Sequence, residues 1–333
     1  MIQTKRKNAL IIGCIVGGIA LVSALLLLLF LPEKRPDPHA LLAKTDVLSE
    51  QNLCLMAILE ENPKDEEALR SLLINYQKLG ADPLTIHATM QAYGAQIELP
   101  TTEVQPESAG KIISRGGIAA IKNDTSAYAV AQGADTTYYA TDEGIYADYH
   151  GLQVQISGIK AEALHAAEGG VYFINRAQKA VEYLARDGHK IQRVSTVKAR
   201  TFTFFNDQIW IVDEEGTLYC GDKTIKTPAP IHSLAATQDT LYAAGLSQEG
   251  TAAGILTISA EGQCETLLSS PAHGLFGGAD GCLYYLNEQS CPMRYDPKTK
   301  EATILAQKRA KAVTYEQGTV YYMNEKGKIK KIA

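Results

Sequence analysis

The side chains that most often do chemistry in enzymes are scattered in this 333-residue chain. The seven histidines run from His39 to His273, and no two of them stand four residues apart, the spacing that places two metal ligands on one helix face. The sequence contains no GxSxG, HExxH, Walker or GxGxxG motif. Acidic neighbours such as Asp213 and Glu214 precede a glycine in a predicted turn, where solvated carboxylates are expected. We therefore predict a protein that is not an enzyme and that holds no metal or other cofactor.

One set of mostly polar residues does recur at a regular place. Each stands nine residues before a short aromatic segment, and the set consists of Tyr128, Glu162, Arg200, His232, Gly274 and Lys311. In the fold derived below, this position is the start of the innermost strands, around one mouth of a central channel. We predict that Tyr128, Glu162, Arg200, His232 and Lys311 form a binding ring there. The alternative for each residue alone is a polar strand end that meets water.

The aromatic segments that define this spacing form an internal repeat. Their sequences are TYYAT, VYFIN, IWIVD, LYAAG, LYYLN and VYYMN, and they begin at residues 137, 171, 209, 241, 283 and 320. The second position is always aromatic. The starts are separated by 34, 38, 32, 42 and 37 residues, a period typical of propellers and solenoids.

Two further positions agree with this alignment. The residue seven places before each start is always apolar: Val130, Leu164, Phe202, Leu234, Phe276 and Val313. The residue two places before each start is always Asp or Gly, which tolerate the backbone angles of a tight turn. Each unit therefore reads as a strand, a turn and an aromatic strand. Later strands are indicated by segments such as TLYCG, KIQRVSTV, TIKTPAP and EATILAQ.

Six units of about four strands predict a mainly β fold, a six-bladed β-propeller over residues 111–333. The last unit, which includes the segment VYYMNEKGKIKKI, ends after its third strand. We expect the segment KIISRGGIAAI (111–121) to supply the missing fourth strand and so to protect the edges of the ring.

The Tyr-Tyr-x-Asn strands, followed by a short turn and a KIKKI-like strand, resemble the YWTD β-propeller of low-density-lipoprotein-receptor proteins. They look more like the related bacterial extracytoplasmic propellers of unknown function. The resemblance covers about residues 111–333. No copy reads Tyr-Trp-Thr-Asp, and LYAAG lacks the Asn or Asp, so the resemblance implies the fold and carries over no receptor ligand.

Three helices are predicted before the propeller, over residues 39–61, 63–79 and 83–93. The signals are Asp82 as an N-cap before Pro83, and Gly80 and Gly94 as terminators. Residues 63–79 resemble the first helix of a tetratricopeptide repeat, but a stable array needs about three copies. We therefore interpret residues 36–95 as a structural helical neck rather than a peptide-binding groove, and residues 96–110 as a linker.

A 23-residue stretch without charges, Ala9–Leu31, follows Lys5, Arg6 and Lys7. It is long enough to span a bilayer. The basic residues predict that residues 1–8 form a cytoplasmic tail and that the propeller lies outside the cell membrane, with 9–31 as a single-pass anchor. A cleaved signal peptide and a lipid-modified Cys14 are the alternatives.

The net charge limits the class of binding partner, and the cysteine spacing limits the metal sites and disulfides that the chain can form. Without residues 1–35, 27 Lys and Arg face 36 Asp and Glu, a formal charge near −9 that argues against nucleic acid. The six cysteines show no metal spacing, and a single pair among Cys264, Cys282 and Cys291 stays open. The sequence therefore predicts a non-catalytic module of the cell envelope that binds or scaffolds a protein or an envelope polymer. The alternatives are an envelope enzyme with a site in the channel, and a structural subunit that self-associates through the neck or through Gly13 and Gly17 of the membrane helix.

Overall fold

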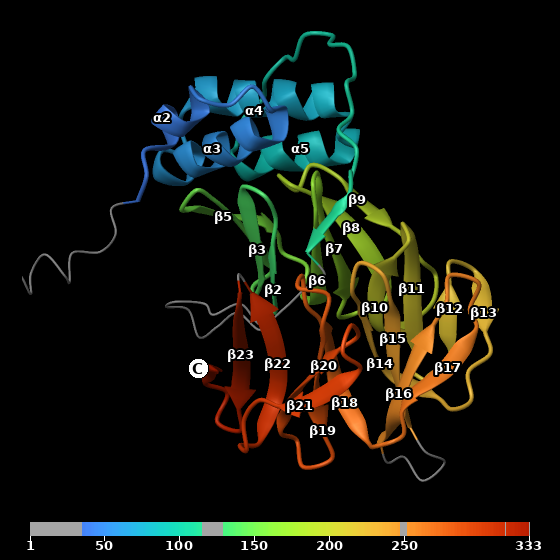
Figure 1. Cartoon of the computed structure of the whole chain (residues 1–333). Helices are drawn as coiled ribbons and strands as arrows, with labels where there is room; N and C mark the ends of the chain where they lie inside the picture. Colours follow the sequence, from blue (N-terminus) through green and yellow to red (C-terminus); the bar gives the residue numbers. More distant parts are fainter. Residues whose placement is uncertain (1–34, 115–128, 247–251, 317, 333) are drawn as a thin grey trace, which may run out of the picture. The chain divides into compact units, whose positions relative to one another are not determined.

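Six antiparallel sheets follow one another along the chain from Ala129 to Lys331 in the computed structural model (Figure 1). The structure describes residues 35–114, 129–246, 252–316 and 318–332. The predicted tail 1–8 and anchor 9–31 lie outside these ranges. None of the helices within them has the length and apolar character needed to cross a membrane.

Each sheet is one blade, and its strands follow one another in chain order, as these bounds show. The first blade holds β2 (Ala129–Gln132), β3 (Thr136–Ala140), β4 (Ile145–Tyr149) and β5 (Leu152–Ser157), and the second β6 (Ala161–Ala167), β7 (Gly170–Asn175), β8 (Val181–Ala185) and β9 (Ile191–Arg193). The third holds β10 (Ala199–Phe205), β11 (Gln208–Asp213), β12 (Leu218–Cys220) and β13 (Lys223–Ile225), and the fourth β14 (Ile231–Ala236), β15 (Leu241–Leu246), β16 (Ala252–Ile258) and β17 (Cys264–Leu268). The fifth holds β18 (Ala272–Gly277), β19 (Leu283–Asn287), β20 (Pro292–Asp296) and β21 (Glu301–Ile304), and the sixth β22 (Ala310–Glu316), β23 (Thr319–Asn324) and β24 (Ile329–Lys331).

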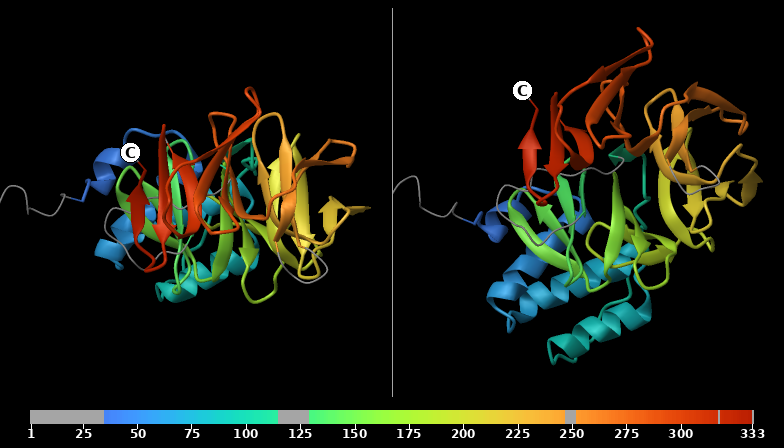
Figure 2. Two further views of the ribbon diagram at one scale, coloured as in Figure 1. Left: turned by 60° about the horizontal axis from the view of Figure 1, so that its bottom comes forward. Right: turned by 90° about the horizontal axis from the view of Figure 1, so that it is seen from below.

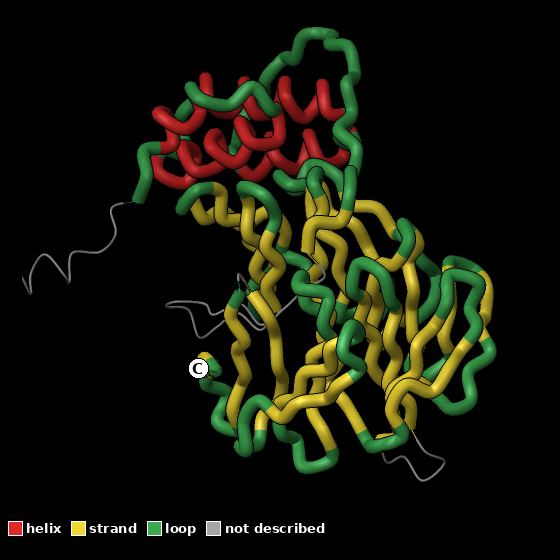
Figure 3. Tube along the Cα trace, viewed as in Figure 1, coloured by secondary structure: helices red, strands yellow, loops and turns green. Residues whose placement is uncertain are grey.

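The first strands of the blades contact one another around the centre. Contacts join β2 with β6, β6 with β10, β10 with β14, β14 with β18 and β18 with β22. The strands of Figure 3 and the two views of Figure 2 let the reader follow this succession of sheets from the first blade to the last. The predicted six-bladed propeller is therefore confirmed.

The aromatic repeat is the second strand of every blade. Tyr138, Trp210, Tyr242 and Tyr284 are almost completely buried. The buried clusters that contain these rings join successive blades, as for Trp210 between the third and fourth. In these four blades one large ring fills the space between two sheets, whereas Tyr172 and Tyr321 of the second and sixth blades are only partly buried.

The closure predicted for the sixth blade is wrong in the part of residues 111–121 that the structure describes. Residues Ile112–Ser114 form β1, which pairs antiparallel with β6 of the second blade. The sixth blade has three strands among the described residues. Within the same ranges, each of the buried clusters between sheets joins two successive blades, and none joins the sixth to the first. Residues 115–121 lie outside the description.

The helical neck consists of α2 (Pro38–Leu42), α3 (Leu48–Glu61), α4 (Glu66–Leu79) and α5 (Pro83–Ala92). The helix predicted over 39–61 is therefore two helices. Thr45 interrupts it, because its hydroxyl accepts a hydrogen bond from Val47 N and donates one to Glu50. The predicted signals at the other helix ends are present. Asp82 caps α5 through Leu84 N, and Gly80 ends α4 with φ +76°.

The segment 96–110 has no helix or strand, as predicted, but it is fixed along its length. Ile97 and Leu99 pack on the core of the helical neck. Glu107 accepts hydrogen bonds from the hydroxyl and the amide of Ser49. Farther on, the carbonyl of Ala109 accepts a hydrogen bond from Gly169 N, in the turn between β6 and β7. The segment thus binds the neck to the second blade.

The neck packs on one end of the first two blades. Leu53, Cys54 and Ala57 of α3 belong to the same buried cluster as residues of both blades. The 96–110 segment contacts the β6–β7 turn, where β6 ends. The neck therefore lies at the end of the blades opposite to the start of β6. Figure 1 shows the helices beside these blades.

A buried polar network crosses this interface. The side chain of Asp187, in the β8–β9 turn, is completely buried and accepts a 2.6 Å hydrogen bond from Nδ2 of Asn52 in α3. The carboxylate of Asp187 also contacts Nδ1 of His189. The side-chain oxygen of Asn52 accepts a hydrogen bond from Nδ2 of Asn75 in α4 at 3.0 Å. A buried carboxylate is expensive unless hydrogen-bonded, so this network specifies how the neck docks.

The substitution Asn52→Ala tests the coupling between neck and propeller. It removes a donor from the buried carboxylate of Asp187, and we expect a loss of about 2–3 kcal/mol in the free energy of unfolding. The helical signal in circular dichroism and the fluorescence of the single tryptophan, Trp210, should shift together in urea. The control Gln91→Ala, on the exposed side of α5, should change stability by less than about 0.5 kcal/mol. A shift of the helical signal alone would mean that the neck unfolds independently.

Candidate functional site

The innermost strands share an irregularity close to their first residue. The pairing of β6, β10, β14, β18 and β22 with the next strand slips by one residue near the start of each. Such a β-bulge leaves one residue unpaired and turns its side chain to a new direction. Five blades therefore carry a bulge near the start of the innermost strand, after the first pair in β10, β14 and β22 and after the second pair in β6 and β18.

The extra residue in three of these bulges belongs to the predicted binding ring. In β10 the partners are Ala199 and Thr201, so Arg200 is the unpaired residue. The same reasoning gives His232 in β14 and Lys311 in β22. The regular spacing in the sequence thus corresponds to a repeated backbone feature. We call Arg200, His232 and Lys311 the bulge ring.

The other ring positions differ from this pattern. Glu162 of β6 lies beside its bulge and forms ion pairs with Lys179 Nζ at 3.0 Å and Arg176 Nε at 3.4 Å. Gly274 of β18 has φ +60°, a conformation that suits glycine. Tyr128 lies outside the described residues. Glu162 is therefore occupied by its own blade, which leaves the ring with a cationic character.

His232 is the most unusual member of the bulge ring. Both of its ring nitrogens are buried, and neither has a hydrogen-bond partner among the residues that the structure describes. Burial lowers the pKa of His232, and the charge of Arg200 and the nearby His273 lower it further. Most buried polar groups in proteins are hydrogen-bonded, so a histidine without partners marks a place where a bound group would be stabilising.

His273 is a site residue that the sequence reasoning missed. It lies one position before Gly274 in β18, which contacts the His232-bearing strand β14, and its charge lowers the pKa of His232. Burial also lowers the pKa of His273. A fixed spacing could not find it, because the bulge shifts the register of β18 by one residue. The signal available in the sequence was the neighbouring His-Gly pair.

Next to the ring, the channel holds a cavity with both apolar and polar side chains in its wall. A cavity of 270 Å³ lies between the first strands of five blades, and the residues predicted to be apolar form much of its wall: Val130, Leu164, Phe202, Leu234 and Phe276. His165 of β6 also lines it, with its ring 4.4 Å from that of Phe202. Thr201 and Thr203 of β10 add polar groups, so the channel is of mixed character beyond its mouth.

The described residues offer no centre for a metal ion. No three His, Cys, Asp or Glu side chains lie close enough together in these ranges to hold one, so His165, His232 and a carboxylate do not meet. The described cysteines Cys54, Cys220, Cys264, Cys282 and Cys291 are all unpaired, so Cys264, Cys282 and Cys291 form no disulfide with one another. Burial raises the pKa of the Cys282 thiol above its ordinary value.

Known proteins resemble the chain in fold only. No family model matches the sequence, and no curated protein matches it. The catalytically inactive virginiamycin B lyase of Staphylococcus aureus is similar with a TM-score of 0.46 and 13% identity, over 67% of this chain and 88% of that one. A nidogen/laminin complex gives 0.45 and 13% over 57% and 86%. The extracellular domain of a putative one-component system from B. thetaiotaomicron gives 0.47 and 12% over 67% and 35%.

A pH titration tests the environment of His232. Its pKa is lower in the folded chain than the value of about 6.5 expected after unfolding. Between those two values the unfolded chain binds more protons, so stability falls as the pH drops below about 6.5. We expect the NMR signal of His232 to titrate below 6.5, and His232→Gln to weaken the loss of stability in acid. Titration of His232 at or above about 6.5 would contradict the assigned environment.

Proposed function

We propose that this chain is a membrane-anchored, extracytoplasmic β-propeller that binds a protein or an envelope polymer at the bulge ring and acts as a non-catalytic scaffold. The observation that carries the proposal is the repeated bulge, which turns Arg200, His232 and Lys311 out of the regular pairing on separate blades. Propellers serve both as binding modules and as enzymes, so the fold alone does not decide the function.

The chemistry of the ring favours an acidic group on the partner. Lys311 is exposed and forms no ion pair with any described residue. Arg200 is also exposed and donates a hydrogen bond to the carbonyl of Glu214. Both charges therefore remain available in spite of the net charge of −5 of the chain. A local basic rim on an acidic protein attracts a carboxylate or phosphate to one place.

The position of the ring favours a large partner. The neck and residues 96–110 contact the propeller at the β6–β7 and β8–β9 turns, whereas the ring stands at the opposite ends of the first strands. The ring-bearing face is therefore free of the neck. In the proposed arrangement, residues 9–31 cross the membrane, Lys5, Arg6 and Lys7 stay inside, and the neck holds the propeller outside. The resemblance to bacterial extracytoplasmic propellers is consistent with this location.

Cross-linking on intact cells tests the proposal. A membrane-impermeant cross-linker should capture a partner on the full-length chain, and the triple variant Arg200→Ala, His232→Ala and Lys311→Ala should lose at least about 90% of the captured partner. The matched control replaces Arg70, His87 and Lys64 of the neck by alanine and should capture as much as the unmodified chain. Unchanged capture by a folded ring variant would contradict the binding face.

Two further outcomes bear on other parts of the proposal. Capture that requires permeabilised cells would overturn the extracytoplasmic location while leaving the ring in place. Capture of nothing but other copies of the chain would favour a self-associating structural subunit. Circular dichroism of both triple variants confirms that each is folded.

A further inference from the structure

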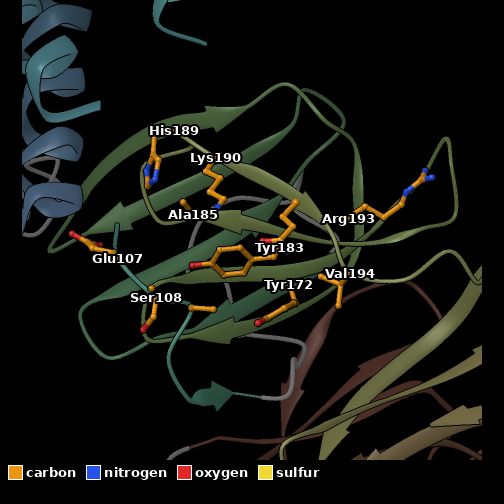
Figure 4. A pocket seen from close by; sticks show the side chains of 12 residues that line it. Glu107, Ser108, Tyr172, Tyr183, Ala185, His189, Lys190, Arg193 and Val194 are labelled. Atoms are coloured by element: carbon orange, nitrogen blue, oxygen red, sulfur yellow. The ribbon is translucent and has the colours of Figure 1, made fainter. Parts of the chain in front are cut away.

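A second cavity lies at the other end of the second blade, on the side of the neck. It has a volume of 380 Å³ and lies between the segment 107–109, the strands β7, β8 and β9, and the β8–β9 turn (Figure 4). This volume is within the range of small-molecule sites. It shares no residue with the bulge ring or with the channel cavity, so it is a separate site.

The wall of the cavity is a row of three side chains on one face of the blade. Tyr172 pairs with Tyr183, and Tyr183 pairs with Gln192, on three neighbouring strands. The rings of Tyr172 and Tyr183 are 4.9 Å apart and tilted by 51°. Tyrosine offers a flat apolar ring and a hydroxyl on the same side chain, a combination that suits amphipathic ligands.

The hydroxyl of Tyr183 has no partner in the described part of the protein. The side chain is 8% exposed, and burial raises its pKa. The hydroxyl lies beside Gly169 and Gly170, where an added Cβ would approach it to 3.0 and 2.9 Å. The two glycines thus leave room for this group, and a tyrosine hydroxyl in the wall of a cavity can both donate and accept a hydrogen bond. A ligand in the cavity would supply one.

The charged side chains that line the cavity differ in their hydrogen bonds and in the direction in which they point. Glu107 is held by Ser49 and points away from Tyr183, and Arg193 donates a hydrogen bond to Gln178 and also points away. Lys190 is exposed, forms no ion pair with a described residue, and points toward Tyr183. Lys190 is therefore the charged side chain directed at Tyr183, while the carboxylate of Glu107 keeps its negative charge at the rim and raises the pKa of Tyr183.

We propose that this cavity binds an acidic monosaccharide. Lys190 pairs with its carboxylate or phosphate, the ring of Tyr172 lies against the apolar C–H face of the sugar, and Tyr183 and Gln192 bond its hydroxyl groups. The half-buried ring of Tyr172 leaves a surface for this contact. The site would bring a sugar-bearing envelope polymer to the junction between the neck and the propeller.

Calorimetric titration of the full-length chain with glucuronate, glucose 6-phosphate and glucose tests the assignment. We expect at least one acidic sugar to bind at least tenfold more tightly than glucose, and the comparison of the two identifies the acidic group. Lys190→Gln should reduce the affinity for the acidic sugar to that for glucose. Tyr183→Phe should weaken the binding of all sugars about three- to tenfold, because it removes only the hydroxyl.

Arg193→Gln is the matched control, since Arg193 borders the cavity but points away from Tyr183. It should leave the affinity for the acidic sugar unchanged. The proposal is overturned if no sugar binds at a concentration of about 20 mM, which is about 20 times a millimolar Kd. It is also overturned if Lys190→Gln binds the acidic sugar as well as the unmodified chain does. Circular dichroism separates loss of binding from loss of folding.

Discussion

Burial of one sheet against the next is the constraint on which this structure depends. A four-stranded sheet cannot cover its own apolar faces, and the aromatic ring of the second strand must be covered by a neighbouring blade. Trp210 and Tyr242 illustrate this, since each is almost completely buried in a cluster that spans two blades. The repeat in the sequence, the succession of sheets and the central channel all follow from that requirement.

The first two blades have an additional cover. The α3 helix contributes Leu53, Cys54 and Ala57 to the cluster between them, and Asn52 bonds the buried Asp187. This contact orients the neck and leads residues 96–110 over the β6–β7 turn, so that β1 pairs with β6. One interface therefore decides which face of the propeller the neck covers.

The sequence predicted what depends on local periodicity. The six aromatic strands, their turns and the ends of α4 and α5 follow from residue types at fixed spacing, so they could be recognised in a single chain. The pairing of β1 with β6 could not, because it joins strands distant in sequence, and the break at Thr45 depends on a local hydroxyl that bonds Val47 N and Glu50 in place of continuing the helix. The bulge ring was found by spacing alone, and its cause, the slip in strand pairing, became visible only in the structure. His273 was missed for the same reason.

The two candidate sites differ in how they could be recognised. The ring positions repeat because the blades repeat, whereas the cavity beside Tyr183 lies where residues 107–109 cross the second blade. A site built from a linker and a blade has no periodic signal. Its residues belong to no sequence motif, and they form a site only because the strand register aligns Tyr172, Tyr183 and Gln192.

The central claim is that the open face at the bulge ring contacts the partner. The most direct measurement compares two variants that each carry one photo-activated cross-linking residue. One variant carries it at exposed Glu215, next to the Glu214 carbonyl that Arg200 bonds. The other carries it at Leu84 of α5, which is 76% exposed. The partner should be cross-linked from position 215 and not from position 84. Cross-linking from position 84 alone would place the partner on the neck and would contradict the assignment of the binding face.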